Sequence, residues 1–338
     1  MRKIRWGVLG AAKIATEKVI PAMMRGQFST VTAIASRDRA RAEAAAQRLG
    51  IPKAHESYDA LLDDPNIDAV YNPLPNHLHV PWSTRAAERG KHVLCEKPIA
   101  LTAAEARQLV AVRDRTGVKI EEAFMVRTHP QWLKTRELIR EGRIGSLRSM
   151  LGHFSYYNED ASNIRNVPEF GGGGLMDIGC YLINLGRFIF ERPPERVMGL
   201  IDNDPRFDVD RMVTMVLDFG DGHAAGTCST QMAAYQRIQL LGTRGRIEIE
   251  IPLNAPPDHP CRILLDQCGD ISGKGIEDIR VASCNQYTIQ GDLFSKAILE
   301  GTDVPVPLED AVVNMECIEA VFRSAASGHW EIPGTVPV

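Results

Sequence analysis

Short apolar runs alternate with helix-forming segments through the first third of the chain. We expect strands where apolar and β-branched residues run together, at 4–9, 30–35, 69–71, 92–95 and 119–124. Segments rich in strong helix formers predict helices between them, at 14–25, 39–49, 82–89 and 103–116. Strands that alternate with helices build βαβ units, so this part of the chain predicts a mainly parallel sheet.

The pattern changes after about residue 125. We expect a helix at 130–141, followed by longer strand-like runs at 147–157, 196–202, 212–219, 223–231, 237–241 and 246–251. Turns such as Gly220-Asp221-Gly222 are typical of hairpins, and helices at 289–300 and 308–327 close the chain. This half predicts an antiparallel sheet with flanking helices. The whole pattern predicts an α/β protein of two domains, 1–124 and 125–338.

The turn after the first predicted strand carries a dinucleotide-binding pattern. Gly10, Ala12 and Ala15 meet the template G-x-G-x-x-G/A only in part, but they lie between a strand and a helix. Gly10 permits a tight turn, and the small residues let a pyrophosphate approach the helix N-terminus. Any tight strand-to-helix turn needs small residues too. We favour a cofactor site, whose expected contacts here are Gly10, Ala11, Ala12, Lys13 and Ile14.

The end of the second predicted strand bears on which nicotinamide cofactor is used. A site for NAD usually places an acid there, where it binds the ribose 2′-hydroxyl. Ser36 and Arg37 stand there instead, and both can donate hydrogen bonds to a 2′-phosphate. The alternative is an ordinary loop in which Asp38 caps the next helix. The charge argument favours NADP over NAD.

Two later segments hold candidate acid/base groups. Glu96-Lys97-Pro98 follows directly after a strand, at the edge where open α/β sheets bind ligands. Four glycines, 171–174, lead into a predicted helix on which Asp177 and Tyr181 are four residues apart and share a face. A phenol and a carboxylate beside a lysine can form an acid/base pair. Each segment also has a plain structural explanation, as a solvated loop and as a capped, buried helix.

Together these motifs resemble the glucose–fructose oxidoreductase / inositol dehydrogenase family, often called Gfo/Idh/MocA. The resemblance covers essentially the whole chain and rests on the glycine turn, Glu96-Lys97-Pro98 and the glycine run that leads to Asp177. It implies an N-terminal Rossmann NAD(P)-binding domain and a C-terminal α/β domain, with an open, mainly antiparallel sheet, for substrate binding and oligomerisation. Tyr181 stands where the common family pattern Asp-x-Gly-x-His has its histidine. In this departure the chain is similar to a branch that holds NADP-dependent D-xylose 1-dehydrogenases and dimeric dihydrodiol dehydrogenase.

The resemblance also implies roles for single residues. Lys97 and Tyr181 would be the catalytic pair, and Asp177 would bind substrate beside them. Arg127 and Asn158 are further candidate substrate contacts, although a capping, surface or turn role would explain them as well. The residues expected around the nicotinamide end of the cofactor are Pro73, Asn76, His79, Glu96, Lys97, Arg165 and Tyr287.

The implied reaction is oxidation of the C1 hydroxyl of a pyranose aldose, such as D-xylose or D-glucose, to its lactone, with NADP as hydride acceptor. A tyrosine, with an ordinary pKa of about 10, is a poor base at neutral pH, and an adjacent lysine ammonium favours its phenolate. Three other enzymes fit the same motifs: a keto-sugar or anhydro-sugar reductase, a trans-dihydrodiol dehydrogenase, and a hydrolase that recycles tightly held NAD. A non-catalytic NADP-binding sensor is the alternative from another class, because a fold alone does not fix function.

Composition and charge exclude some classes of binding partner. The chain has 39 basic and 43 acidic residues and a formal charge of −4, which offers nucleic acid no electrostatic footprint. No apolar stretch approaches the roughly 20 residues that span a bilayer, so we expect no membrane partner and a cytoplasmic location. The predicted antiparallel sheet has one face to cover, which favours a homodimer or a dimer of dimers through that sheet.

Neither a disulfide framework nor a metal site is expected. The seven cysteines are odd in number and none forms a C-x-x-C pair. His77 and His79 have a spacing that a metal could use, but no acid or cysteine with matching spacing joins them. The expected ligands are therefore NADP and a small carbohydrate.

Overall fold

The computed structural model describes residues 2–267 and 271–335. The chain forms two compact units: unit 1 comprises Met1–Met125 and Asn285–Val312, and unit 2 comprises Val126–Cys284 and Val313–Val338. The sequence pattern assigns 285–312 to the second part of the chain, whereas in the structure this segment packs within unit 1. The chain therefore leaves unit 1, builds most of unit 2, and returns.

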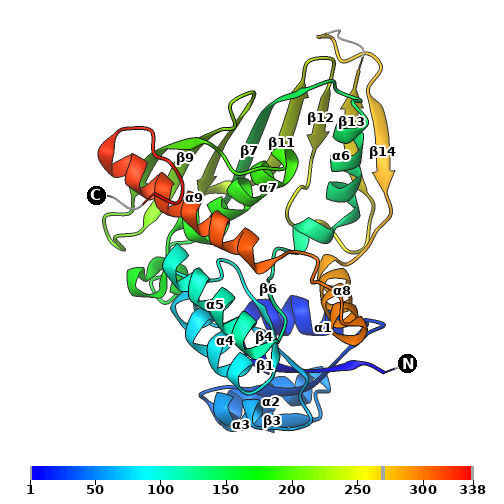
Figure 1. The fold of residues 1–338 in the computed structure, drawn as a ribbon, viewed down its shortest axis with the longest axis vertical. Helices are drawn as coiled ribbons and strands as arrows, with labels where there is room; N and C mark the ends of the chain where they lie inside the picture. Colours follow the sequence, from blue (N-terminus) through cyan, green and yellow to red (C-terminus); the bar gives the residue numbers. More distant parts are fainter. Residues whose placement is uncertain (1, 268–270, 336–338) are drawn as a thin grey trace. The chain divides into compact units, whose positions relative to one another are not determined.

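Unit 1 is built on a six-stranded parallel sheet in the order β3-β2-β1-β4-β5-β6 (Figure 1). The strands are β1 (Ile4–Leu9), β2 (Ser29–Ala35), β3 (Lys53–His55), β4 (Ala69–Asn72), β5 (His92–Cys95) and β6 (Ile120–Glu122). This is the doubly wound order, in which the chain reverses direction across the sheet between β1 and β4. Ligands of such sheets bind outside the carboxyl ends of the strands near that reversal.

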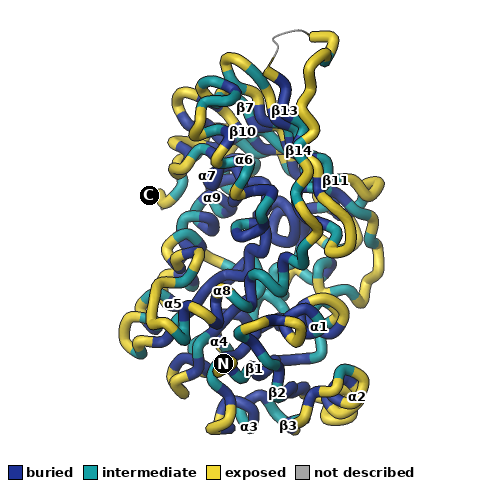
Figure 2. The backbone as a smooth tube through the Cα atoms, turned by 90° about the vertical axis from the view of Figure 1, so that its right-hand side faces the viewer, coloured by how far each residue is buried: buried dark blue, intermediate teal, exposed yellow. Residues whose placement is uncertain are grey.

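Helices flank this sheet. They are α1 (Ile20–Met23), α2 (Arg39–Leu49), α3 (Tyr58–Leu62), α4 (His79–Glu88), α5 (Ala103–Thr116) and α8 (Gln286–Glu300). Side chains cap several of them: Asp38 accepts from the N–H of Arg41 at the start of α2, and Thr102 accepts from that of Glu105 at the start of α5. In Figure 2 the tube is buried along β1 and exposed along much of α2, as expected for a central strand and an outer helix.

Segment 285–312 joins unit 1 because α8 packs against the start of the chain. The indole N–H of Trp6, a fully buried residue of β1, donates to Ser295 Oγ at 3.0 Å. The Asp292 carboxylate accepts from the main-chain N–H of Gln27 at 2.7 Å. These side chains of α8 accept hydrogen bonds from donors in β1 and in the loop before β2.

Unit 2 is built on an eight-stranded sheet in the order β14-β13-β12-β11-β7-β10-β9-β8. The strands are β7 (Leu147–Tyr157), β8 (Arg196–Asn203), β9 (Asp210–Asp218), β10 (His223–Ser229), β11 (Gln231–Gly242), β12 (Arg246–Ile249), β13 (Cys261–Asp266) and β14 (Glu277–Val281). Neighbouring strands pair antiparallel except β7 and β10, which run parallel. The expectation of a mainly antiparallel sheet is confirmed, with this one parallel pair as the exception.

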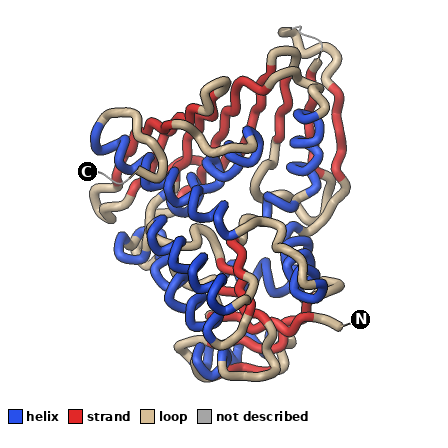
Figure 3. The backbone as a smooth tube through the Cα atoms, viewed as in Figure 1, coloured by secondary structure: helices blue, strands red, loops and turns tan. Residues whose placement is uncertain are grey.

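Helices cover one face of the second sheet (Figure 3). They are α6 (Pro130–Arg140), α7 (Cys180–Phe190) and the unit 2 part of α9 (Leu308–Ser327). Gly152 of β7 leaves room for α7, since a Cβ there would lie 2.9 Å from Leu182 Cδ2, and Gly199 of β8 leaves similar room for Val321 of α9. Side chains alternate along a strand, so Leu151 and Leu200, the neighbours of these glycines, point to the opposite face, where both are exposed.

The first helix and four short elements differ from the sequence-based expectation. A helix was expected at 14–25, but the structure has a π-helical turn at Ala15–Val19 followed by the short α1. Pro21 lacks the N–H that a regular helix would need there, and it sits in the first turn of α1, where prolines are tolerated. The elements absent from the prediction are β3, α3, β13 and β14.

In the described part of the chain, no helix has the length and apolar character that a bilayer crossing requires. None of the six cysteines in that part forms a disulfide, and Cys268 lies outside the described residues.

Candidate active site

β1 ends in a turn that is built for glycine. Gly10 has φ +94°, and its N–H donates to Ala35 O at 2.7 Å. A Cβ at this position would lie 3.1 Å from Cδ2 of Leu74. Ala11, Ala12 and Ile14 are partly buried against the core, and Lys13 is exposed. The turn therefore carries no side chain at Gly10 and only small ones at Ala11 and Ala12, which suits the approach of a pyrophosphate.

A group of hydrogen-bond donors gathers at the end of β2. The hydroxyl of Tyr58 lies close to both the main chain and the side chain of Arg37. Burial raises the pKa of Tyr58, and the Arg37 charge acts in the opposite direction. The pKa of His77 is lowered, first by burial and then by Arg37. Ser36 is buried beside Arg37, and its Oγ accepts from the N–H of Asp38 at 3.3 Å.

Asp38 itself is turned away from this group, because its carboxylate caps α2. Of the group, Ser36 and Arg37 were predicted, whereas Tyr58 and His77 were not predicted as cofactor contacts. Tyr58 opens α3, a helix that the sequence pattern does not show, and His77 follows β4. A polar residue after a strand was the only signal for His77, and it is a weak one.

The loop after β5 carries Lys97, which is half-buried. The peptide bond between Lys97 and Pro98 is cis. On the preceding residue, Glu96, the carboxylate accepts from Tyr71 Oη at 2.6 Å. Burial and then the charge of Glu96 raise the pKa of Tyr287, so this phenol also lies against Glu96. Unit 1 therefore brings together Glu96 and Tyr287, two of the predicted nicotinamide contacts.

The other predicted contacts of unit 1 follow β4. Pro73 is buried directly after the strand, and Asn76 opens the short 3₁₀ turn Asn76–Leu78. His79 begins α4 and is only 1% exposed. Its Nδ1 lies 2.7 Å from Pro98 O and its Nε2 lies 2.6 Å from Leu74 O. Both ring nitrogens thus face main-chain carbonyls, which leaves neither for a cofactor and places His79 in the support of the site.

In unit 2, the glycine run 171–174 packs so closely against Arg165 and Asp210 that Gly172 and Gly173 leave no room for a side chain. A Cβ on Gly172 would lie 2.5 Å from Arg165 O, and one on Gly173 would lie 1.9 Å from Asp210 Oδ1. Gly173 also has φ +106°, and its N–H donates to Arg165 O at 2.8 Å. The run therefore fixes Arg165 and the start of the next helical segment relative to each other.

That segment begins with a π-helical turn, Leu175–Gly179, which carries Asp177. Tyr156 Oη donates to Asp177 Oδ2 at 2.6 Å, and Arg165 Nε lies 2.7 Å from the same oxygen. Burial, followed by the Asp177 charge, raises the pKa of Tyr156 well above its ordinary value, so this phenol is a proton donor to the carboxylate. Tyr156 was not predicted, since on β7 it is one aromatic residue in an alternating pattern.

Tyr181 is the second residue of α7 and is 5% exposed, with its ring packed edge-on against Phe154. Asn184, three residues further along α7, accepts from Arg127 Nη1 at 3.2 Å. Asn158 is half-buried after β7, and its side chain accepts from the N–H of Asp160, which closes a turn. The structure thus brings Asp177, Arg165 and Tyr156 into direct contact. Arg127 contacts α7 through its hydrogen bond to Asn184, and Asn158 stabilises a turn.

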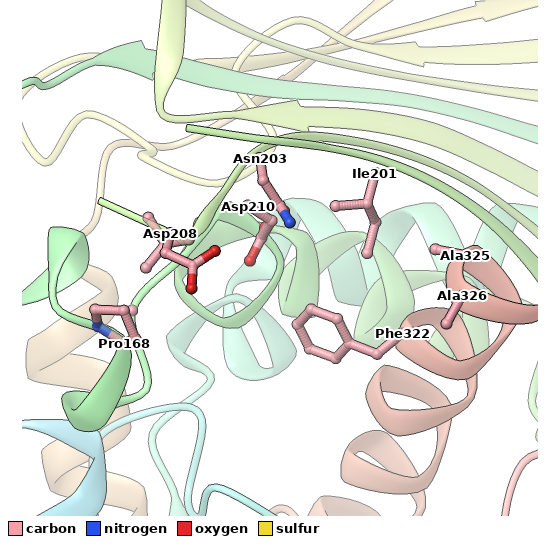
Figure 4. Close-up of a pocket in the computed structure, with 10 residues that line it drawn as sticks. Pro168, Ile201, Asn203, Asp208, Asp210, Phe322, Ala325 and Ala326 are labelled. Carbon is pink, nitrogen blue, oxygen red and sulfur yellow. The ribbon is translucent and has the colours of Figure 1, made fainter. Parts of the chain in front are cut away.

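A pocket of about 420 Å³ lies against the glycine run in unit 2 (Figure 4). Asn203, Asp208 and Asp210 of the β8–β9 hairpin face Phe322 and two alanines of α9 across it. Asp210 Oδ2 accepts from the N–H of Leu175 at 2.5 Å, and burial raises the pKa of Asp210 to about 7. None of the lining residues is a predicted site residue, although Gly172 of the glycine run is one of them. Over the described ranges, no three His, Cys, Asp or Glu side chains come together as metal ligands would.

Two family models match the chain. The model described as "Oxidoreductase family, NAD-binding Rossmann fold" matches residues 4–124. The model described as "GFO/IDH/MocA C-terminal domain" matches residues 132–248. Together the two matches span more than half of the chain.

Single relatives match over nearly the whole length. An uncharacterized oxidoreductase of Rhizobium meliloti is 46% identical over 98% of this chain and 99% of its own. D-xylose 1-dehydrogenase (NADP(+)) 2 of Haloferax volcanii is 36% identical over 96% of this chain and 98% of its own. The solved structure of KijD10, a 3-ketoreductase from Actinomadura kijaniata in complex with NADP and TDP-benzene, matches with a TM-score of 0.89, at 30% identity over 96% of this chain and 98% of that one. The chain therefore belongs to the Gfo/Idh/MocA family of oxidoreductases, and residues 4–124 form its NAD-binding Rossmann fold.

Proposed function

We propose that the chain is an NADP-dependent dehydrogenase that oxidises the C1 hydroxyl of a pyranose aldose, of the D-xylose or D-glucose type, to the lactone. The observation that carries the proposal is the presence of both Lys97 and Tyr181, each at a position that the surrounding main chain and side chains define. Lys97 stands at the carboxyl edge of the parallel sheet. Tyr181 follows one turn after Asp177, whose carboxylate two donors hold in place. A relative named as a D-xylose 1-dehydrogenase supports the choice of aldose.

The solved structures of the 3-ketoreductase support the choice of these two residues. They include variants of that enzyme in which a lysine becomes alanine and a tyrosine becomes phenylalanine. The separation between that lysine and that tyrosine along the chain equals the separation between Lys97 and Tyr181 here.

In the proposed reaction Tyr181, as phenolate, accepts the proton of the C1 hydroxyl. The ammonium of Lys97 favours the phenolate, because an opposite charge nearby lowers the pKa of a phenol. Asp177 accepts hydrogen bonds from substrate hydroxyls, and Tyr156 and Arg165 keep its carboxylate oriented. The nicotinamide, when bound, accepts the hydride. Hydride transfer is reversible, so the same groups serve reduction with Tyr181 as proton donor.

The donors at the end of β2 favour NADP. Arg37, Tyr58 and Ser36 offer a guanidinium and two hydroxyls where a 2′-phosphate would need them. An acid at this place would serve NAD instead, but Asp38 is engaged as the cap of α2. The turn at Gly10 fits the pyrophosphate, as described above.

A keto-sugar reductase is the second candidate, and one observation favours it. A solved structure of a 3-ketoreductase matches this chain with a TM-score of 0.89. The two candidates differ in substrate and in the direction of hydride transfer, and not in the residues that we propose for proton transfer.

The open face of the eight-stranded sheet supports the proposal of a homodimer. Leu200 of β8 is 73% exposed on this face, and Leu151 of β7 is exposed there too. Next to them, Thr214 and Thr227 meet across β9 and β10. A second copy of the same face would cover these side chains in a symmetric contact.

The test is absorbance at the reduced-nicotinamide band, with NADP and NAD and a panel of aldoses, keto-sugars, polyols and diols. NADPH formed from one aldose supports the proposal, and NADPH consumed with a keto-sugar supports the second candidate. We expect Lys97→Ala to lower turnover by at least 100-fold while NADP still binds. The control is Lys296→Ala, which removes an exposed lysine of α8. NADP binding with no turnover of any panel member would favour a sensor instead.

A further inference from the structure

We propose that His79 and Glu122 are positioning residues for Lys97. Each holds main-chain atoms of Glu96–Ile99, the segment that we call the Lys97 loop. The inference rests on the proposed function, in which Lys97 takes part in proton transfer. According to this inference, the side chains of His79 and Glu122 determine the position of the Lys97 ammonium.

His79 joins the Lys97 loop to the loop after β4. Its buried ring lies between Pro98 O, 2.7 Å from Nδ1, and Leu74 O, 2.6 Å from Nε2. A neutral imidazole has one N–H and donates to one of these two carbonyls, and with the proton on Nδ1 it donates to Pro98 O in the Lys97 loop. Asn72 holds the main chain of His79 in place, because the Nδ2 of Asn72 donates to His79 O at 3.1 Å. His79 therefore acts on the residue directly after Lys97.

Glu122 holds the same loop from β6. It is the last residue of that strand and is only 3% exposed. Its Oε1 accepts from the main-chain N–H of Ile99 at 2.8 Å. A hydrogen bond from an amide to a carboxylate is stronger than one between neutral groups, so the position of Ile99 is closely defined.

The residue before Lys97 is anchored as well. The Glu96 carboxylate is held by Tyr71 Oη, and the Glu96 N–H donates to Asn72 O at 3.0 Å. The main chain on both sides of Lys97 is thus tied to β4, α4 and β6. The position of Lys97 matters for the rate, because a displacement of about 1 Å at a reacting group can cost 100-fold.

A purely structural role is the competing explanation. Buried main-chain groups need hydrogen-bond partners in any fold, and His79 and Glu122 supply them here. The two explanations predict different results for the folded enzyme. A structural role lowers the melting temperature alone, whereas a positioning role lowers kcat in enzyme that is fully folded and still binds NADP.

The first experiment compares His79→Phe with His79→Gln. Phenylalanine keeps the ring's bulk and removes both nitrogens, whereas glutamine keeps one donor. With the best sugar of the panel, and well below the melting temperature, we expect kcat to fall about 10- to 100-fold in His79→Phe. We expect His79→Gln to recover part of that loss, and the Kd for NADPH to stay within about twofold in both. The matched control is His92→Phe, since His92 is a half-buried histidine of β5 whose Nδ1 accepts from the Lys119 N–H.

The second experiment repeats the comparison at Glu122. Glu122→Gln keeps an acceptor for the Ile99 N–H, and Glu122→Leu removes it. We expect a large loss of kcat in Glu122→Leu and a small one in Glu122→Gln, again with NADPH affinity retained.

The outcomes separate this inference from the proposed function. Wild-type kcat in His79→Phe and Glu122→Leu, beside an inactive Lys97→Ala, would overturn the positioning role alone. Wild-type kcat in Lys97→Ala, or no turnover of any sugar by the unaltered enzyme, would overturn the proposed function.

Discussion

The hydrogen bond from Tyr156 to Asp177 gives two tyrosines of unit 2 different tasks. Burial and the Asp177 charge raise the pKa of Tyr156, so its hydroxyl stays protonated and orients the carboxylate. Tyr181 is part of α7, and its ring lies edge-on against Phe154. Under the proposed function, Tyr156 orients the Asp177 carboxylate and Tyr181 transfers the proton.

Tyr156→Phe tests this division. The change keeps the ring and removes one charge-assisted hydrogen bond, which is worth about 1.5–3 kcal/mol. We expect kcat/KM for the sugar to fall roughly 10-fold or more, with the Kd for NADPH unchanged. Tyr157→Phe is the matched control, because Tyr157 is the next residue and is 64% exposed. Equal kinetics in the two variants would contradict the role of Tyr156.

Arg37→Ala tests the choice of cofactor. Loss of the guanidinium removes a charge-assisted bond to a 2′-phosphate and nothing that NAD needs. We expect the Kd for NADP to rise about 10- to 100-fold and the Kd for NAD to stay the same, as measured by fluorescence titration. Arg39→Ala, which removes an exposed arginine paired with Glu43, should change neither. A matching loss of affinity for both cofactors would remove Arg37 from the 2′-phosphate site.

The placement of single residues after a strand could be predicted from the sequence. Ser36, Arg37 and Lys97 each follow a strand of the parallel sheet, and the apolar runs that predict those strands are visible in the sequence. Tyr58 reaches Arg37 only through the packing of α3, and no local pattern records that contact. His79 appears in the sequence as a polar residue in a loop, and only the fold reveals that α4 begins there and buries its ring.

Among the elements, the sequence pattern predicted most strands that have strong apolar runs, but it missed β13, which has one, as well as the weaker β3 and β14. β3 has three residues, and β14, with the sequence Glu-Asp-Ile-Arg-Val, is mostly charged. Both lie at sheet edges, where pairing with a neighbour decides the conformation and the local pattern is weak. The π-helical turn before α7 was also missed, because a helical pattern does not distinguish one extra residue in a turn.

Asp210 gives the glycine run a pH-dependent support. Its pKa is raised from 3.8 to about 7, chiefly by burial, so the folded state holds a proton that the unfolded state releases. Stability should therefore fall as pH rises from about 4 to 7, by roughly 1.4 kcal/mol per pH unit at most, and level off above. Asp210→Asn removes this dependence. In urea titrations, the unfolding free energy of the variant should therefore rise relative to that of the wild type as the pH increases from about 4 to 7.

Asp208→Asn is the control for this measurement. Asp208 is the exposed neighbour of Asp210 and has φ +53°, a conformation that asparagine tolerates. Its stability profile should run parallel to that of the wild type. A parallel profile for Asp210→Asn as well would show that Asp210 does not titrate in this range.

At the scale of the whole molecule, the open sheet face predicts the state of assembly. Leu200→Glu puts a charge into the proposed contact, and both copies of a symmetric dimer would carry it. We expect sedimentation to show a mass of twice 37.4 kDa for the wild type and a shift towards 37.4 kDa for the variant. Ile332→Glu, at an exposed position outside the sheet, should leave the mass unchanged. A wild-type monomer would contradict the dimer.

The return of the chain to unit 1 has a consequence for synthesis on the ribosome. Trp6 emerges from the ribosome long before its partner Ser295, which lies 289 residues further along the chain. All six strands of the parallel sheet are made by residue 122, yet the core around β1 waits until α8 is translated. The nucleotide-binding unit is therefore begun first but completed only after most of unit 2 has been made, and a fragment that stops at residue 125 would contain every strand of its sheet without the helix that closes it.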